Sequence, residues 1–188
     1  MLEKNKIEIL KNRLNTCKFS KLDCGINNLK IEEIYSLIFI YSLAEFTAID
    51  ISFDNCLVNK AKKAILEAKI KSKLFDRKIK EEPLLFISCY SSFLYEKELS
   101  EIEKRLKKCC DSGADFFEIH IDNFHLELFR EKIELIKEYF PSKPLSINLS
   151  RQKFSNSNML DFIKEFKLKI IKELIIEVDG NEKQNNLG

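Results

Sequence analysis

Acidic side chains and a histidine stand two residues apart near the ends of short apolar runs. Asp50 lies in the run Ala48–Ser52, and Glu118 and His120 lie in the run Asp115–Ile121. Residues two apart in an extended strand point to the same face, so Glu118 and His120 would share one face of a sheet. Carboxylates and an imidazole that converge there can transfer protons or bind a small polar molecule. We therefore predict Asp50, Glu118 and His120 as candidate catalytic residues.

Further polar residues lie after or within other apolar runs and are candidates for binding a small polar ligand. Asn27 follows the first run, Asn148 lies in the fifth, and Glu177 and Asp179 lie in the sixth. For Asp50, Glu118 and His120 a structural role fits as well, in which they pair with one another or with backbone groups as a satisfied polar layer.

Two kinds of chemistry lack their usual sequence pattern. His120 and His125 flank Asp122, but they do not have the four-residue helical spacing of a zinc motif, so no metal site is predicted. Aldolase chemistry through a Schiff base needs a lysine that projects from a strand into the barrel. None of the six apolar runs has a lysine near its carboxyl end, so we do not expect this mechanism.

The elements that would position these residues are six apolar runs that alternate with helical stretches. The runs are Lys21–Gly25, Ala48–Ser52, Leu84–Cys89, Asp115–Ile121, Pro144–Ser150 and Glu173–Asp179. Near-continuous apolar strands separated by helices are typical of βαβ units and of a parallel sheet that is buried on both faces. Functional groups in such folds lie at the carboxyl ends of the strands.

The helical stretches complete a single α/β domain over residues 1–188. Apolar periodicity predicts helices at Ile31–Ala44, Asn59–Ile70, Glu96–Cys110, Leu126–Phe140 and Asn158–Leu168, with a helical lead-in over 1–16 and an irregular tail over 181–188. Six units favour an incomplete (β/α)8 barrel, because a full barrel takes about 250 residues. An open doubly wound sheet is the alternative, although the first turn lacks the G-x-G-x-x-G fingerprint.

The composition of the chain argues against some classes of protein, such as nucleic-acid-binding and membrane-spanning proteins. The chain has 188 residues, 45% of them hydrophobic and 33% charged, which is typical of a globular domain with a sizeable core. The formal net charge of +2 gives no reason to expect nucleic acid as a partner. No apolar stretch approaches the roughly 20 residues that span a bilayer, and no signal peptide is recognisable, so we expect a cytoplasmic or plastid stromal protein.

The six cysteines are scattered, and no two of them have the C-x2-C spacing of a cluster motif. Free, mostly buried thiols in a reducing compartment are therefore expected.

Several short segments resemble the LdpA family, the light-dependent period proteins of cyanobacteria. They are Lys21–Gly25 with Asn27-Asn28, Tyr41–Ala44 leading to Ala48–Ile51, Glu118–His120, and Asp179-Gly180 followed by Leu187-Gly188. That family carries a cysteine-rich iron–sulfur module between its third and fourth strand units, where this chain has only Tyr90–Tyr95. The resemblance thus implies a barrel without the cluster, and no cofactor is predicted. The turn at Gly25–Asn28 and the segment Gly113–Asp115 are also similar to an uncharacterised barrel family of plastid and cyanobacterial genomes.

Three function classes follow. The resemblance implies a regulatory or interaction protein linked to light- or redox-dependent input to the circadian clock, with a protein partner or a second copy covering the very apolar helix at Ile31–Ala44. The second class is a small barrel enzyme or binding protein for a polar metabolite, acting through Asp50, Glu118 and His120. The third is a truncated remnant of a barrel protein.

Overall fold

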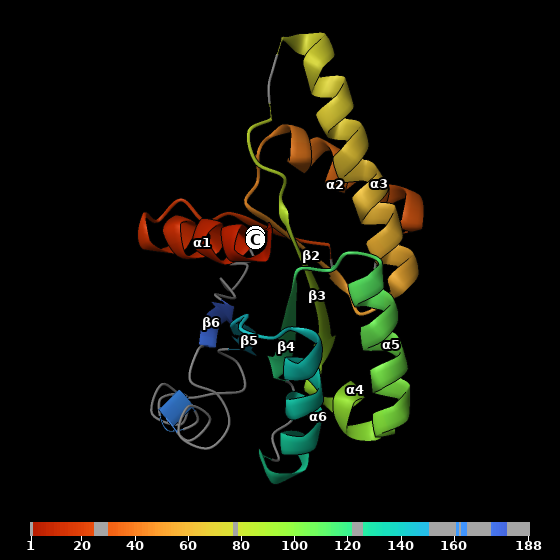
Figure 1. The fold of residues 1–188 in the computed structure, drawn as a ribbon, viewed down its shortest axis with the longest axis vertical. Coiled ribbons are helices and arrows are strands. Elements are labelled where there is room, and N and C mark those ends of the chain that lie inside the picture. Colours follow the sequence, from red (N-terminus) through yellow and green to blue (C-terminus); the bar gives the residue numbers. More distant parts are fainter. Residues whose placement is uncertain are drawn as a thin grey trace, which may run out of the picture.

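Six parallel strands form one sheet whose strand order follows the chain. The computed structural model describes residues 2–24, 30–76, 79–121, 126–150, 161, 163–164 and 174–179. The strands are β1 (Lys21–Asp23), β2 (Ala48–Ser52), β3 (Leu84–Tyr90), β4 (Phe116–Ile121), β5 (Leu145–Ser150) and β6 (Leu174–Asp179), and each pairs with its neighbours in sequence. The sheet curls into a half-barrel (Figure 1), which confirms the incomplete α/β barrel.

Helices connect the strands, as the alternating pattern predicts. They are α1 (Leu2–Asn15), α2 (Ile31–Leu43), α3 (Asn55–Ser72), α4 (Ser91–Glu96), α5 (Leu99–Asp111) and α6 (Leu126–Tyr139), with a 3₁₀ turn, η1 (Lys73–Phe75), after α3. Figure 1 shows α3 and α5 along one side of the strands and α1 on the other.

The helices differ from the prediction in three places. α3 begins at Asn55 rather than at residue 59, because the Asp54 carboxylate accepts hydrogen bonds from the backbone N–H groups of Cys56 and Leu57 and so caps the helix. Most of the stretch Tyr90–Tyr95, for which no helix was predicted, belongs to α4, and the next helix, α5, begins at Leu99 rather than at residue 96. The predicted helix over 158–168 and the turn that contains Asn27 lie largely or wholly outside the described residues.

The larger core lies between the convex face of the sheet and the outer helices. It contains Ile49, Ile87 and Ile119 from neighbouring strands together with Ile38 of α2 and Leu106 of α5, all fully buried. The sequence predicts this arrangement for α5, where Ile102, Leu106 and Cys109 are buried at helical spacing. Gly113 then adopts a positive φ of 97° just after the helix, as expected for a glycine that ends one.

A smaller core closes the amino-terminal end of the half-barrel. Leu10 of α1 is fully buried and packs in one cluster with Ala48, Leu84, Phe86 and Phe116 from three strands. An ion pair between Lys6 of α1 and Asp115, just before β4, adds to this contact. α1 therefore forms a floor beneath the concave face of the sheet, the face that carries Asp50, Glu118 and His120.

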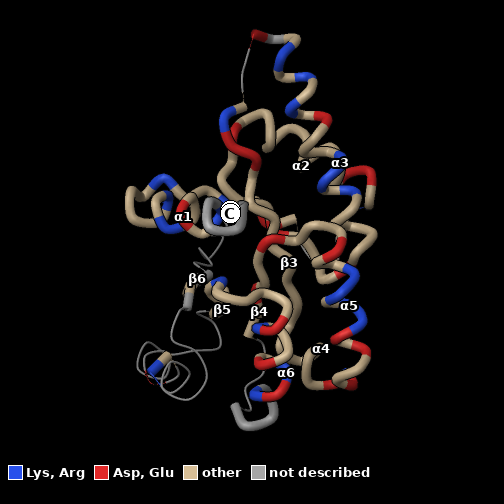
Figure 2. Tube along the Cα trace, in the orientation of Figure 1, with Lys and Arg blue, Asp and Glu red and all other residues tan. Residues whose placement is uncertain are grey.

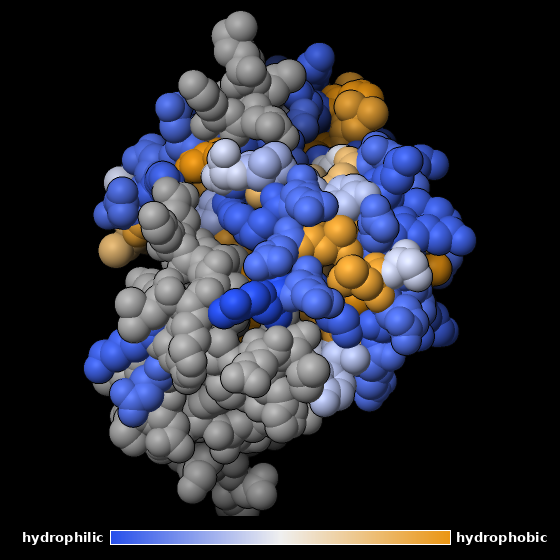
Figure 3. Space-filling view, turned by 60° about the horizontal axis from the view of Figure 1, so that its bottom comes forward, coloured by the Kyte–Doolittle hydropathy of each residue, from blue (hydrophilic) through white to orange (hydrophobic). Residues whose placement is uncertain are grey.

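The surface carries both signs of charge and scattered apolar side chains. Basic residues predominate along α3, and along α5 acidic residues stand at both ends of a basic middle (Figure 2). Separate apolar areas lie between hydrophilic residues on the face shown in Figure 3, and the exposed large apolar residues include Ile40, Leu66, Ile70 and Leu74. Among the described helices, none has the length and apolar character needed to cross a membrane.

Candidate functional site

The register of the sheet places the candidate catalytic residues on one face. In β1 and β2, Asp23 is paired with Asp50, and in β4 and β5, His120 is paired with Asn148. Two residues earlier in the same two strands, Glu118 is paired with Ser146. Because side chains alternate along each strand, all of these groups share the concave face. The structure therefore brings Asp50, Glu118 and His120 together as the sequence predicts.

Glu118 is fully buried, and its carboxylate accepts hydrogen bonds from two side chains. Lys21 Nζ donates to both oxygens, at 2.8 and 2.9 Å, and Ser146 Oγ donates to Oε2 at 2.5 Å. The Lys21 side chain is only 6% exposed, and its Nζ also lies 5.9 Å from the centre of the Phe86 ring. This arrangement is a buried ion pair with supporting hydrogen bonds, which is the condition under which buried charges are tolerated.

Lys21 is a functional-site residue that the sequence analysis missed. It is the first residue of the three-residue strand β1, not at the carboxyl end where a barrel lysine was sought, and its long side chain reaches Glu118 on the concave face. Its two-residue spacing from Asp23 could have identified it, because residues two apart in a strand point to the same face. Because a Schiff-base lysine must act as a free amine and Lys21 is paired with Glu118, we assign it no covalent role.

Asp50 differs from Glu118, because none of the described residues donates a hydrogen bond to its side chain. Its side chain is completely buried, and neither carboxylate oxygen accepts a hydrogen bond from any described residue. His120 Nε2 lies 3.6 Å from Asp50 Oδ2 and 3.4 Å from Glu118 Oε1, and it too is buried without a hydrogen bond in the described part of the chain. A separation of 3.6 Å is an ion-pair contact and is too long for a hydrogen bond.

Burial and neighbouring charges shift the titration of this pair. Burial raises the pKa of Asp50 from 3.8 to about 7; the charges of Glu118 and Asp23 act in the same direction, while His120 and Lys21 oppose them. For His120, burial acts to lower the pKa, but interaction with the Asp50, Glu118 and Asp23 carboxylates outweighs it, and the net pKa is raised. Both shifts favour the protonated form of the group concerned.

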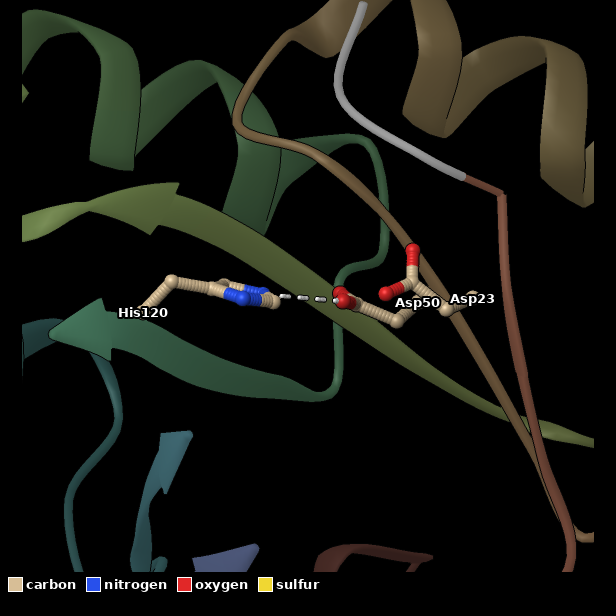
Figure 4. Close-up of side chains that lie close together, drawn as sticks. All are labelled: Asp23, Asp50 and His120. Carbon is tan, nitrogen blue, oxygen red and sulfur yellow. Dashed lines mark ion pairs between the residues drawn. The ribbon is translucent and has the colours of Figure 1, made fainter. Parts of the chain in front are cut away.

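Asp23 completes a cluster of possible ligand atoms. One atom each from Asp23, Asp50 and His120 lies within 4.8 Å of the others. Figure 4 shows the three side chains close together, with an ion pair between His120 and Asp50. Asp50 and His120 are buried or nearly so, whereas Asp23 is exposed. Three ligands from three different strands leave no spacing signal within one segment, so the sequence analysis found no metal site. Residues 122–125, which include Asp122 and His125, lie outside the described part of the chain.

The predicted ligand-binding residues are only partly placed. Asn148 is 4% exposed and lies beside His120 on the concave face. In the backbone register, Glu177 pairs with Asn148 and Asp179 pairs with Ser150, so the sheet extends to both residues, although their side chains lie outside the described part of the protein. Asn27 also lies outside the described residues.

Two neighbours line the site without an obvious chemical role. Cys24 follows β1, and burial raises the pKa of its thiol to about 12, with the charges of Asp50 and Asp23 adding to the effect. A thiol held in its protonated form is a poor nucleophile. Tyr90, at the end of β3, lies edge-on to His120 with ring centres 5.7 Å apart.

Comparisons with known proteins identify the fold. No family model matches the chain, and no curated protein matches its sequence. The solved structures that resemble it include a type I 3-dehydroquinate dehydratase from Clostridium difficile, with 12% identity and a TM-score of 0.53 over 94% of this chain. An N-acetylneuraminate lyase from Proteus mirabilis gives 11% identity and a TM-score of 0.51 over 88%.

A third similar structure is the carboxyl transferase domain of pyruvate carboxylase from Rhizobium etli, with 8% identity and a TM-score of 0.50 over 84% of this chain. The chain spans 67% of the dehydratase, 57% of the lyase and 27% of the carboxylase structure. At such low identity these neighbours establish the barrel-like fold and nothing more. They do not bear on the resemblance to the LdpA family, which stays a prediction.

Proposed function

We propose that the concave face of the half-barrel binds a small polar carbonyl compound and moves protons to and from it. The observation that carries this proposal is the Asp50 carboxylate, which is completely buried and accepts no hydrogen bond from the described residues. Leaving a buried carboxylate without donors costs several kcal/mol, and such arrangements are concentrated at functional sites. A substrate that enters beside Asp50 would supply the missing partner.

The groups around Asp50 supply both a proton acceptor and a proton donor. The Asp50 carboxylate takes a proton from the carbon beside a carbonyl, and the electron pair of that C–H bond becomes the second bond of a C=C. The carbonyl oxygen receives the displaced pair and takes a proton from His120, which gives a neutral enol. Reversal of the two transfers restores a carbonyl compound. Glu118, 3.4 Å from His120 Nε2, stabilises the protonated imidazole before it donates its proton and again after the reverse transfer returns it.

Lys21 and Ser146 act as positioning residues in this scheme. Their three hydrogen bonds fix the Glu118 carboxylate and leave His120 facing Asp50. Ser88 of β3 lies between Ser52 of β2 and Glu118 of β4 in the register. The fold likeness to a dehydratase and a lyase is compatible with such a scheme and does not by itself support it.

Hydrogen–deuterium exchange at carbon tests the proposal without a known substrate. The full chain is incubated in D₂O and EDTA with a panel of small hydroxy acids, oxo acids and sugars, and loss of C–H signals is followed by proton NMR. We expect one compound class to exchange. His120→Gln and Asp50→Asn should slow that exchange by about 100-fold or more, the usual contribution of a general acid or base.

The control is Asp111→Asn, which removes an exposed aspartate at the end of α5 and should leave exchange unchanged. Circular dichroism verifies that all three variants are folded. Exchange that persists in both site variants, or a panel that neither exchanges nor raises the melting temperature, would contradict the proposal.

A further inference from the structure

Three ligand atoms from three strands meet on the concave face. They belong to Asp23 of β1, Asp50 of β2 and His120 of β4, and all lie within 4.8 Å of one another (Figure 4). An imidazole nitrogen with two carboxylate oxygens is a ligand set that divalent transition metals accept, whereas a site for Mg²⁺ or Ca²⁺ is built from oxygens.

The second observation is the state of the two buried ligands. Asp50 is completely buried, and neither of its oxygens accepts a hydrogen bond within the described residues. His120 Nε2 is likewise buried and makes no hydrogen bond there. Both unpartnered groups point toward one another in Figure 4, so the polar atoms that most need a partner face the same small volume.

The spacing of these atoms suits a bound ion better than direct contact. Asp50 Oδ2 and His120 Nε2 are 3.6 Å apart, beyond hydrogen-bonding distance. Two ligand atoms that each lie about 2.1 Å from one tetrahedral ion are about 3.4 Å from each other. The observed separation therefore needs only a small adjustment to take an ion between the two atoms.

We propose that Asp23, Asp50 and His120 bind one divalent transition-metal cation, such as Mn²⁺ or Zn²⁺. Asp23 is exposed, so the ion enters from the solvent side and keeps at least one position for water, as catalytic metal sites do. Glu118 remains with Lys21 and Ser146, which hold it as a neighbour of the ligand His120.

This inference goes beyond the proposed function and needs no substrate. The cation would occupy the space between Asp50 and His120, so these two side chains transfer protons only in the metal-free protein. Proton transfer to a carbonyl compound is tested in EDTA, and cation binding is tested without any carbonyl compound. The two proposals can therefore fail separately.

Mn²⁺ is the sharper probe, because the six thiols of the chain are poor ligands for it and would confuse a zinc titration. The full chain, freed of metal with EDTA and then of EDTA, is titrated with MnCl₂. The signal of free Mn²⁺ is followed by electron paramagnetic resonance, and the melting temperature is measured in parallel. We expect one equivalent to bind and the melting temperature to rise.

Variants of the ligands locate the ion. Asp50→Asn and His120→Gln should weaken Mn²⁺ binding by at least about 100-fold, since even residues behind a ligand contribute 10- to 100-fold. Asp23→Asn is the safer test, because Asp23 is exposed and its replacement leaves the core intact. Asp111→Asn should bind as the unaltered chain does. Failure to bind one equivalent of Mn²⁺, or binding that survives all three ligand substitutions, would overturn the inference.

Discussion

Asp50 is expected to reduce the stability of the metal-free protein. Replacing it by asparagine removes a buried charge that has no hydrogen bond among the described residues, so Asp50→Asn should raise the free energy of unfolding at pH 8 in EDTA by a few kcal/mol. Urea denaturation measures the change. An unaltered or lower stability of the variant would show that the carboxylate has donors outside the described residues.

The same residue gives a pH dependence with a definite sign. The pKa of Asp50 is about 7 in the folded chain, against an ordinary value of 3.8 for an exposed aspartate, so between these values the folded state binds more protons than the unfolded state. Stability should therefore fall as pH rises toward and through 7, by up to about 1.4 kcal/mol per pH unit for one proton. The charges that face Asp50 come from Lys21, Asp23, Glu118 and His120, and His120, with its raised pKa, contributes in the same direction. Asp50→Asn should flatten this part of the profile.

The buried ion pair between Lys21 and Glu118 behaves differently, because each partner compensates the other. Lys21→Met should destabilise the protein by about 3–5 kcal/mol, since it leaves the Glu118 charge buried without its cation. Adding Glu118→Gln should recover part of that loss. Urea denaturation of the two single variants and the double variant gives the coupling energy, and additive effects would contradict a direct pair.

At the level of elements, α1 contributes to stability through one face. Leu10 is fully buried against the strands, whereas Leu14, one turn later, is 38% exposed. Leu10→Ala should cost about 2–5 kcal/mol of unfolding free energy, because it leaves a cavity in the smaller core. Leu14→Ala is the matched control and should cost less than about 1 kcal/mol. Equal effects in thermal or urea unfolding would show that α1 is not fixed beneath the sheet.

The elements themselves were largely predictable, and the exceptions have physical reasons. Apolar runs and helical periodicity predict the strands and most helices, because each element has to bury a face. The start of α3 depended on a single capping group, Asp54, which lies shortly before the predicted start of the helix. α4 is only six residues long, too short for its periodicity to stand out.

The site was less predictable than the fold because it depends on contacts between strands that are not neighbours. Alternation predicts that Glu118 and His120 share a face, but their distance to Asp50 depends on how strongly the sheet curls. Neighbouring strands lie about 4.8 Å apart, so in a flat sheet β2 and β4 would be about 10 Å apart. The observed 3.6 Å contact between Asp50 and His120 requires the curled sheet and inward-reaching side chains.

For the whole molecule, the half-barrel leaves two strands at the ends of the sheet. Among the described residues, β1 pairs only with β2 and β6 only with β5. Open strand edges can pair with another chain, so the expected protein partner or second copy stays a prediction. Light scattering on the purified chain should detect a dimer or larger species, and a monomer at every concentration would contradict self-association.

The contact between Lys21 and Glu118 also bears on the order in which the chain folds. The two residues are 97 positions apart, and their strands lie at positions one and four of the sheet. Closing so long a loop is entropically costly, so this contact should form after neighbouring strands have paired. Weakening the ion pair should then accelerate unfolding while leaving the folding rate nearly unchanged, as expected for interactions made after the rate-limiting barrier. Stopped-flow measurements on Lys21→Met would show this as a shift confined to the unfolding arm of the denaturant plot. The ion pair would thus set how long the curled sheet survives once formed.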